Sequence, residues 1–368
     1  MKVFSVDGDD VALLRDGAQA FPAMEAAIAG ATREVLLEMY WVGDDVVGRR
    51  FREALTQKAR QGVRVRVVYD AVGSLTLRHT FWQPLIEASG EVFDYHSFSP
   101  FRPTFRLRNL EERDHRKLLV VDGRTAFTGG INLARPWLPI DEGGDGFRDD
   151  MISVEGFGAQ ELRTLFYKTW RKLGGVAPKD LIPVGRSRRR RVWVLSSLQK
   201  KRSLRQEYLV RIRTAQHNID IANSYFVPDR AVRAALARAA ARGVRVRILV
   251  PARGDVPIVQ FALEGFFDRL LRHGIEVYTM TGPLMHAKTA IIDDHFVTIG
   301  SYNFDHRSFT KNLELNVAVE DVAFATHVRA FFEEDVRKSK QIVLAEWLRR
   351  SLVRRPVEWA ALALRRLW

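Results

Sequence analysis

The fold is decided by two stretches, EVLLEMYWVGDDVVGRRFREALTQKARQGVRVRVVYD at residues 34–70 and NIDIANSYFVPDRAVRAALARAAARGVRVRILVP at residues 218–251. Each begins with a short apolar run that ends in an aromatic pair, and continues into an amphipathic stretch rich in alanine, leucine and arginine. Each then reaches a glycine, Gly62 or Gly243, and this glycine is followed by alternating valine and arginine residues. These patterns are typical of a strand, a helix closed by a glycine, and a second strand. Both stretches therefore predict a βαβ unit.

The similarity of the two stretches continues along the chain. Residues 86–95 match residues 271–280, and residues 114–132 match residues 285–303. We therefore expect an α/β fold built by tandem duplication, with two modules that are each a mixed β-sheet flanked by helices. We expect a pseudo-twofold axis to relate the modules and one active site to be shared by them. The predicted boundaries are residues 1–185, residues 186–340, and an amphipathic, basic C-terminal tail at residues 341–368.

Length and composition exclude several classes of protein. The chain has 368 residues, of which 46% are hydrophobic and 10% aromatic, so a mainly disordered chain is excluded. It has no cysteine, which excludes disulfides, thiol catalysis and cysteine-ligated metals. The net charge of +14 predicts attraction to nucleic acid, an anionic membrane or a phosphate-bearing substrate, and does not choose among them. From the apolar runs and the N-terminal residues we expect neither a transmembrane helix nor a secretory signal.

Each module carries the same motif, His-x-Lys-(x)4-Asp followed by Gly-Gly or Gly-Ser and an asparagine. The two copies are His115, Lys117, Asp122, Gly129, Gly130 and Asn132, and His286, Lys288, Asp293, Gly300, Ser301 and Asn303. The apolar residues around each aspartate predict two strands joined by a turn. Histidine and lysine lie two residues apart and face the same side of a strand, whereas the aspartate lies seven residues from the histidine and faces the other side. We place all three residue types in the catalytic set and expect Asp122 and Asp293 to act mainly through structure.

These residue types suit phosphoryl chemistry. The two lysines, together with Asn132, Asn303 and Ser301, supply the positive charge and the hydrogen-bond donors that bind a phosphoryl group. One imidazole can attack phosphorus while the other protonates the leaving oxygen. Because the ammonium groups can stabilise the phosphoryl oxygens, we predict neither a metal nor a cofactor. A carboxylate should orient each histidine, and Glu314 and Asp149 are the candidates for this role.

The paired motifs resemble those of the phospholipase D superfamily, over a region from about Leu13 to about Phe332. Four flanking stretches are similar to the bacterial cardiolipin synthase branch: RDHRKLLVVDG at 113–123, FRD at 147–149, NSYFVPD at 223–229 and HRSF at 306–309. The sequence departs from the family pattern at Gly130, where serine is usual, and keeps the serine at Ser301.

The resemblance implies a metal-free transfer of a phosphatidyl group through a phosphohistidine intermediate. Phosphatidylglycerol would be the donor and a second phospholipid or an alcohol the acceptor, with hydrolysis when water substitutes. By the family pattern His115 is the nucleophile and His286 the general acid and base, an order that the internal symmetry leaves open. The resemblance also implies an anionic phospholipid substrate and a peripheral location on the cytoplasmic face of a bacterial inner membrane. It leaves the oligomeric state open.

Several basic or apolar segments bear on the choice between a membrane and nucleic acid. The tail at 341–368 has apolar residues at helical spacing, interspersed arginines, and an expected helix break at Pro356. It favours a membrane interface but could pack on the protein's own core or on a dimer partner. The apolar stretch 256–271 could likewise face lipid tails or pack in the core. Residues 97–108, rich in phenylalanine and arginine, could enter lipid or stack on bases. Residues 177–191 are either a solvated linker or a phosphate-contacting loop.

Two alternatives to a lipid enzyme therefore stay open. The first is a phosphodiesterase of the same superfamily that cleaves nucleic acid, and the second is a non-catalytic membrane-binding module. The histidines outside the two motifs are interpreted as ordinary polar or capping residues: His79, His96, His217, His273, His295, His306 and His327.

Overall fold

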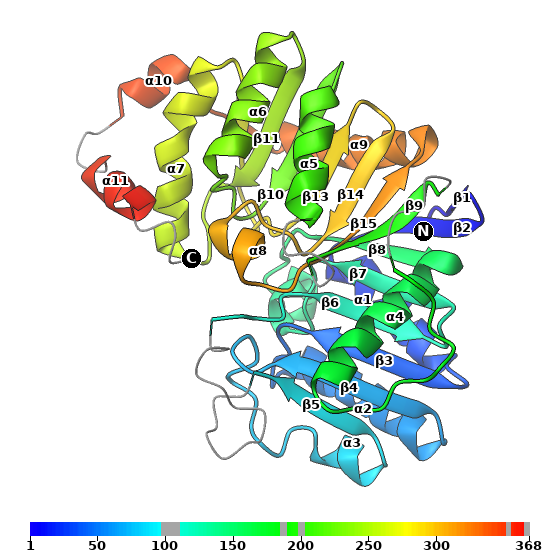
Figure 1. Cartoon of the computed structure of the whole chain (residues 1–368). Coiled ribbons are helices and arrows are strands. Elements are labelled where there is room, and N and C mark those ends of the chain that lie inside the picture. Colours follow the sequence, from blue (N-terminus) through cyan, green and yellow to red (C-terminus); the bar gives the residue numbers. More distant parts are fainter. Residues whose placement is uncertain (97–110, 185–189, 198–202, 351–354, 364–368) are drawn as a thin grey trace. The chain divides into compact units, whose positions relative to one another are not determined.

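The protein forms two compact α/β units (Figure 1). The structure is a computed structural model that describes residues 1–96, 111–184, 190–197, 203–350 and 355–363. The first unit comprises Met1–Leu195, Ile299–Ser301 and Asn312–Val317, and the second comprises Ser196–Thr298, Tyr302–Lys311 and Ala318–Trp368. The change of unit thus falls at residue 195, where the sequence suggested 185, and two short segments around the second motif belong to the first unit.

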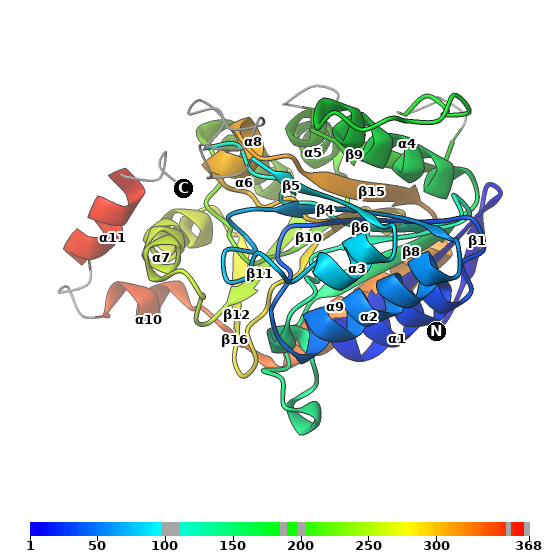
Figure 2. The ribbon, with the colours of Figure 1, turned by 90° about the horizontal axis from the view of Figure 1, so that it is seen from below.

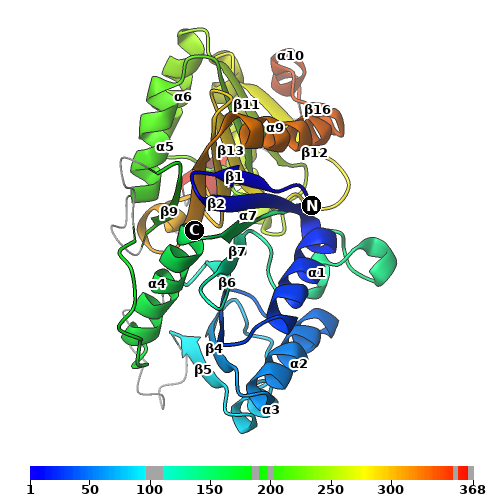
Figure 3. The same cartoon turned by 90° about the vertical axis from the view of Figure 1, so that its right-hand side faces the viewer.

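The first sheet has the strand order β1-β2-β8-β7-β6-β3-β4-β5. Its strands are β1 (Phe4–Val6), β2 (Asp9–Arg15), β3 (Glu34–Met39), β4 (Arg64–Asp70), β5 (Glu91–Tyr95), β6 (Lys117–Val121), β7 (Thr125–Gly129) and β8 (Asp150–Glu155). The helices are α1 (Asp16–Ala29), α2 (Val46–Arg60), α3 (Gln83–Glu87) and α4 (Phe157–Lys172), with short 3-10 turns at Arg135–Trp137 and Ile140–Glu142. α1, α2 and α3 lie side by side on one face (Figure 2), and α4 covers the other face (Figure 3).

The second sheet has the strand order β16-β12-β11-β10-β13-β14-β15-β9. Its strands are β9 (Val192–Ser196), β10 (Asn218–Asn223), β11 (Arg245–Pro251), β12 (Glu276–Met280), β13 (Lys288–Ile292), β14 (Phe296–Gly300), β15 (Leu315–Glu320) and β16 (Ser339–Gln341). The helices are α5 (Ser203–Thr214), α6 (Arg230–Ala241), α7 (Pro257–Arg272), α8 (His306–Thr310), α9 (Val322–Arg337), α10 (Leu344–Leu348) and α11 (Arg355–Ala363). α5 and α6 cover one face of this sheet, and α9 covers the other (Figure 3).

The strand orders confirm the duplication. The series β5-β4-β3-β6-β7-β8 of the first sheet is repeated as β12-β11-β10-β13-β14-β15 in the second. Both predicted βαβ units are present, because β3 pairs parallel with β4 across α2, and β10 pairs parallel with β11 across α6. The pseudo-twofold axis and the shared site stay predictions.

The helices of the two βαβ units begin and end where the sequence indicated. Asp45 and Asp229 are the N-caps of α2 and α6, and their carboxylates accept hydrogen bonds from backbone amides of the first turn. Gly62 and Gly243 follow the helix ends with φ of +83° and +90°. This left-handed backbone is open to glycine without strain, which explains why a glycine closes both helices.

The described part of the C-terminal tail contains two helices, α10 and α11. α10 is a short helix, and α11 starts at Arg355 with Pro356 in its first turn. Proline is tolerated there because it lacks only an amide that the first turn leaves unbonded, and α10 ends before it at Leu348. Trp347 packs on Phe267 of α7 with ring centroids 5.0 Å apart, so part of the tail packs on the protein itself.

Three other predicted segments are placed as follows. The apolar stretch 256–271 is α7, and it buries residues such as Phe266 and Leu270 in the second unit. Residues 97–108 lie outside the described residues, as does most of the arginine run of 177–191. Arg190 at the end of that run pairs with Asp9 and lies 3.9 Å from the centre of the Phe157 ring. Among the described helices, none is long and apolar enough to cross a bilayer.

Candidate active site

The first motif begins where β3 ends and β6 starts. The two strands are antiparallel, with Met39 opposite Lys117, which brings the aromatic pair after β3 close to His115. The imidazole is buried and meets the Tyr40 ring edge-on, with centroids 4.8 Å apart. The His115 amide donates to the carbonyl of Leu313 at 3.0 Å, which fixes the backbone before β6.

Glu314 is the carboxylate that orients His115. Nδ1 of His115 lies 3.1 Å from Oε2 of Glu314, and the same oxygen accepts a 2.5 Å hydrogen bond from the hydroxyl of Ser301. Burial alone would raise the pKa of Glu314. The charge of His115 and the hydrogen bonds from His115 and Ser301, together with the charge of Lys117, outweigh burial and lower that pKa. Glu314 is therefore an ionised, fully buried partner of the histidine.

The other donors of the first motif contact backbone or aromatic groups. Lys117 Nζ donates to the carbonyl of His115 at 2.6 Å and lies 4.9 Å from the centre of the Tyr40 ring. Asn132 accepts from the amide of Trp41 at 3.1 Å through its side-chain oxygen. The aromatic pair that follows β3, Tyr40 and Trp41, thus contacts His115, Lys117 and Asn132 of the motif.

The second motif forms a similar cluster in the second unit. Lys288 Nζ donates to the hydroxyl of Ser224 at 2.9 Å and lies 3.1 Å from Nδ1 of His286. Ser224 in turn donates to the side-chain oxygen of Asn303 at 3.1 Å. Tyr225 stands near His286, with ring centroids 6.3 Å apart, where Tyr40 stands near His115. Sequence reasoning did not single out Ser224, although its place before the aromatic residue was a usable signal.

Both motif aspartates lie at the far end of their strand, in the turn that follows it. Asp122 accepts hydrogen bonds from the backbone amides of Thr32, Arg33 and Glu34. Asp293 accepts in the same way from the amides of residues 216–218. Burial alone would raise the pKa of Asp122, but the amides of Glu34, Thr32 and Arg33 lower it. These carboxylates therefore tie the loop before the first strand to the motif hairpin, and we propose that their role is structural.

Asp149, the second predicted orienting carboxylate, is fully buried in the first unit. Its oxygens accept from Nε1 of Trp137 at 2.9 Å and from the amide of Asp150 at 2.9 Å. A side chain at Gly130 would collide with the Asp149 carboxylate, which explains why serine is absent there. Its pairing with a histidine stays a prediction.

A buried ion cluster flanks His115, and the sequence analysis missed it. Arg116 is fully buried and donates to Asp114, to Glu38 at 2.6 Å and to Thr169 at 2.8 Å. Burial raises the pKa of Glu38 well above its usual value. Burial also favours neutral Asp114, but the adjacent Arg116 lowers the pKa of Asp114. The signal was the charged run Arg113-Asp114-His115-Arg116-Lys117. The second motif has apolar Met285 and Ala287 at the equivalent places.

Comparison with known proteins gives consistent results. The family model described as "Cardiolipin synthase, PLD-like domain" matches residues 24–140 and 208–336. The probable cardiolipin synthase YwiE of Bacillus subtilis (strain 168) is 33% identical over 355 residues, which are 95% of this chain and 70% of the relative. The major cardiolipin synthase ClsA of the same organism is 32% identical over 357 residues, 95% of this chain and 73% of the relative. Among solved structures, phosphatidylserine synthase of Haemophilus influenzae Rd KW20 has a TM-score of 0.74 at 15% identity, covering 97% of this chain and 93% of that one, which is a likeness of fold.

The duplicated fold carries one His-x-Lys motif in each half, and the match to the PLD-like family model places the chain in the phospholipase D superfamily. Within this superfamily, the chain belongs to the cardiolipin synthase-like family.

Proposed function

We propose that the protein transfers a phosphatidyl group from phosphatidylglycerol to a second phosphatidylglycerol, through a phosphohistidine intermediate. Membership of the family makes the chain a phospholipid phosphatidyltransferase. The finer proposal adds the donor, the acceptor, the covalent intermediate and some hydrolysis when water replaces the acceptor. The observation that carries it is the contact between Nδ1 of His115 and the ionised Glu314.

This contact favours His115 as the nucleophile. A carboxylate only accepts hydrogen bonds, so Nδ1 of His115 carries the proton and Nε2 is the unprotonated, nucleophilic nitrogen. When Nε2 attacks phosphorus the ring becomes positive, and Glu314 stabilises that charge. The contact recorded for Nδ1 of His286 is the Lys288 ammonium, which would oppose a growing positive charge. The same ammonium favours the loss of a proton from a protonated His286, as a general acid requires.

The reaction then proceeds in two balanced steps. In the first step, Nε2 of His115 forms a bond to phosphorus and the bond from phosphorus to the oxygen of the headgroup glycerol breaks. His286 gives that oxygen a proton. In the second, a hydroxyl of the acceptor forms the new phosphorus–oxygen bond, the bond to nitrogen breaks, and His286 takes the hydroxyl proton. Lys117 and Lys288 would balance the charge of the phosphoryl oxygens. The sum is cardiolipin and glycerol from two molecules of phosphatidylglycerol.

Work on a lipid substrate requires contact with a membrane. The net charge of +14 favours an anionic bilayer surface, and the described helices include none that could span it. We propose a peripheral association with the cytoplasmic face of a bacterial inner membrane.

The test is an assay of the full chain on phosphatidylglycerol vesicles, with lipid products identified by mass spectrometry. We expect cardiolipin from the wild type, none from His115→Ala or His286→Ala, and a phosphatidyl group bound to His115 when turnover of the wild type is stopped with denaturant. Absence of both cardiolipin and phosphatidic acid from the wild type would overturn the proposal. Cleavage of DNA or RNA that His286→Ala abolishes would point to the nuclease alternative.

A further inference from the structure

We propose that a cavity of the second unit binds the phosphate of the acceptor phospholipid, an inference that rests on the transfer proposed above. The cavity has a volume of about 620 Å³. α5, α6 and α8 supply its wall together with the residues before α6. Its charged and aromatic lining comes from Arg205, Asp229, Arg230, His306 and Phe309.

Arg205 is held in a fixed orientation at the cavity wall. Its Nε and Nη2 each lie 2.6 Å from a carboxylate oxygen of Asp229, and its guanidinium lies 6.0 Å from the centre of the Phe309 ring. Asp229 is fixed in turn, because its other oxygen accepts from the amide of Val232 at 2.9 Å. A guanidinium that is already oriented loses little side-chain entropy when its remaining N–H groups bind a phosphate.

Arg230 supplies a second positive charge and connects the cavity to an apolar surface. It is the first residue of α6, and its side chain is exposed. It also lines an adjoining hollow of about 200 Å³ between α6 and α7, where the apolar lining is Ala234, Ala237, Leu270 and Ile275. A charged cavity that shares Arg230 with a mainly apolar hollow matches a phospholipid, with a phosphate next to a diacylglycerol, better than it matches a free phosphate ion.

The cavity lies close to the second motif. Ser224, which contacts both Lys288 and Asn303, is three residues before Val227 of the cavity wall. His306 of the same wall is three residues after Asn303. Three residues span at most about 11 Å, so both segments reach the cavity within that distance of the motif. In phosphatidylglycerol only the glycerol carbons separate the reacting hydroxyl from the lipid's own phosphate, so that phosphate must be bound near the reacting centre.

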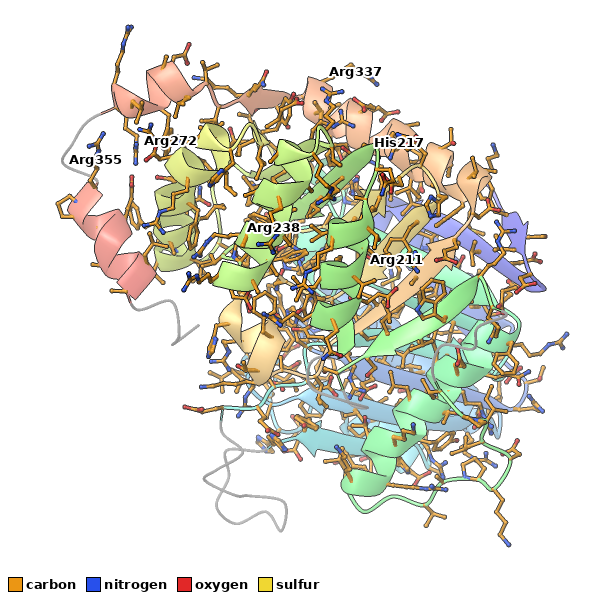
Figure 4. All side chains as sticks on the ribbon, turned by 45° about the horizontal axis from the view of Figure 1, so that its top comes forward. Arg211, His217, Arg238, Arg272, Arg337 and Arg355 are labelled. Carbon is orange, nitrogen blue, oxygen red and sulfur yellow. The ribbon has the colours of Figure 1, made fainter. Side chains whose placement is uncertain are left out.

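The first arm of the test measures how the enzyme partitions between acceptors. The full chain acts on phosphatidylglycerol vesicles with ethanol present, and cardiolipin and phosphatidylethanol are both quantified. Ethanol carries no phosphate, so we expect Arg230→Ala to lower the ratio of cardiolipin to phosphatidylethanol about tenfold, a loss in the range of one charge-assisted contact. The matched control is Arg238→Ala, an exposed arginine of the same helix that lines none of the described cavities (Figure 4). An unchanged ratio in Arg230→Ala, or an equal fall in Arg238→Ala, would overturn the inference.

The second arm needs no turnover, so it separates this inference from the proposed function. Calorimetry measures binding of glycerophosphoglycerol, the headgroup without acyl chains, and of inorganic phosphate to the wild type and to Arg230→Ala. Binding of the headgroup that Arg230→Ala weakens about tenfold, with weaker binding of phosphate, supports a lipid headgroup site even if no product forms. Equal binding of both probes would indicate a free-phosphate site, and binding that does not depend on Arg230 would indicate another location. Either of these results contradicts the inference.

Discussion

At the residue scale, the two histidines share a motif but have different recorded partners. Nδ1 of His115 contacts the carboxylate of Glu314, and Nδ1 of His286 contacts the ammonium of Lys288. The sequence predicted Glu314 as the orienting carboxylate of the second motif and Asp149 as that of the first, whereas Glu314 contacts His115 of the first motif. Glu314 follows the second motif in the chain yet belongs to the first unit. Such a pairing depends on tertiary structure, which spacing along one chain does not encode.

Glu314→Gln should slow the formation of the phosphohistidine. The amide cannot stabilise a positive imidazole, and it can present a donor to Nδ1 and so favour the wrong tautomer. We expect a fall in kcat of about 10²–10⁴-fold, the range for a group that supports acid–base catalysis. The measurement is single-turnover labelling of His115 on phosphatidylglycerol vesicles.

The control for this variant is the pH dependence of the free energy of unfolding. Because the pKa of Glu314 is lowered in the folded protein, its ionised form stabilises the fold above its unfolded-state pKa of about 4.3. That contribution is lost as the pH falls through the folded-state value. The free energy of unfolding measured with urea should therefore fall between about pH 5 and pH 3 in the wild type. In Glu314→Gln it should fall less over the same range. Labelling of the variant at the wild-type rate would contradict the assigned role.

At the element scale, hydrophobic periodicity predicted the βαβ units and the motif hairpins, because strand and helix periods are local properties. It did not predict what holds the strand β6 next to His115. Arg116 was assigned no role of its own from the sequence, and it is fully buried between Asp114 and Glu38. The tail shows the same limit, since apolar spacing alone could not tell a bilayer-facing helix from one that packs on α7.

The ion cluster predicts two opposite outcomes for two of its members. Arg116→Met leaves Asp114 without its buried counter-ion, which should cost about 3–5 kcal/mol of unfolding free energy. Glu38→Gln should cost less than about 1 kcal/mol, because burial already favours the neutral acid and the amide keeps an acceptor for Arg116. Urea unfolding at neutral pH gives both values.

The same cluster also determines how the stability of the fold should change with pH. The pKa of Glu38 is raised in the folded protein, so its protonated form stabilises the fold at low pH, and this contribution is lost as the pH rises through the folded-state value. The Glu38→Gln variant should lack that loss. Equal destabilisation by the two substitutions would show that both carboxylates are charged in the cluster.

At the scale of the whole molecule, the sequence predicted the duplication, and the strand orders confirm it. The net charge of +14 indicated an anionic partner without naming it. The family match then favoured phospholipid. One part of the tail packs on the protein, since Trp347 contacts Phe267. Other apolar residues of the tail are exposed, namely Val343, Leu348 and Val357. This combination of exposed apolar residues and a basic chain is typical of a protein that lies on an anionic surface.

Binding to membranes should therefore depend on both lipid charge and salt. The full chain should cosediment with phosphatidylglycerol vesicles at low ionic strength and not with phosphatidylcholine vesicles, because each basic residue near an anionic surface contributes about 1 kcal/mol. The Debye screening length shortens from about 30 Å at 0.01 M salt to about 3 Å at 1 M. The amount of protein bound to phosphatidylglycerol vesicles should therefore fall at least about tenfold across this range. The residual binding at high salt measures the apolar contribution. Val357→Asn adds no charge, so it should lower this residual binding without changing the slope against salt. Equal binding to both kinds of vesicle at every salt concentration would show that apolar insertion, and not charge, holds the protein on the bilayer.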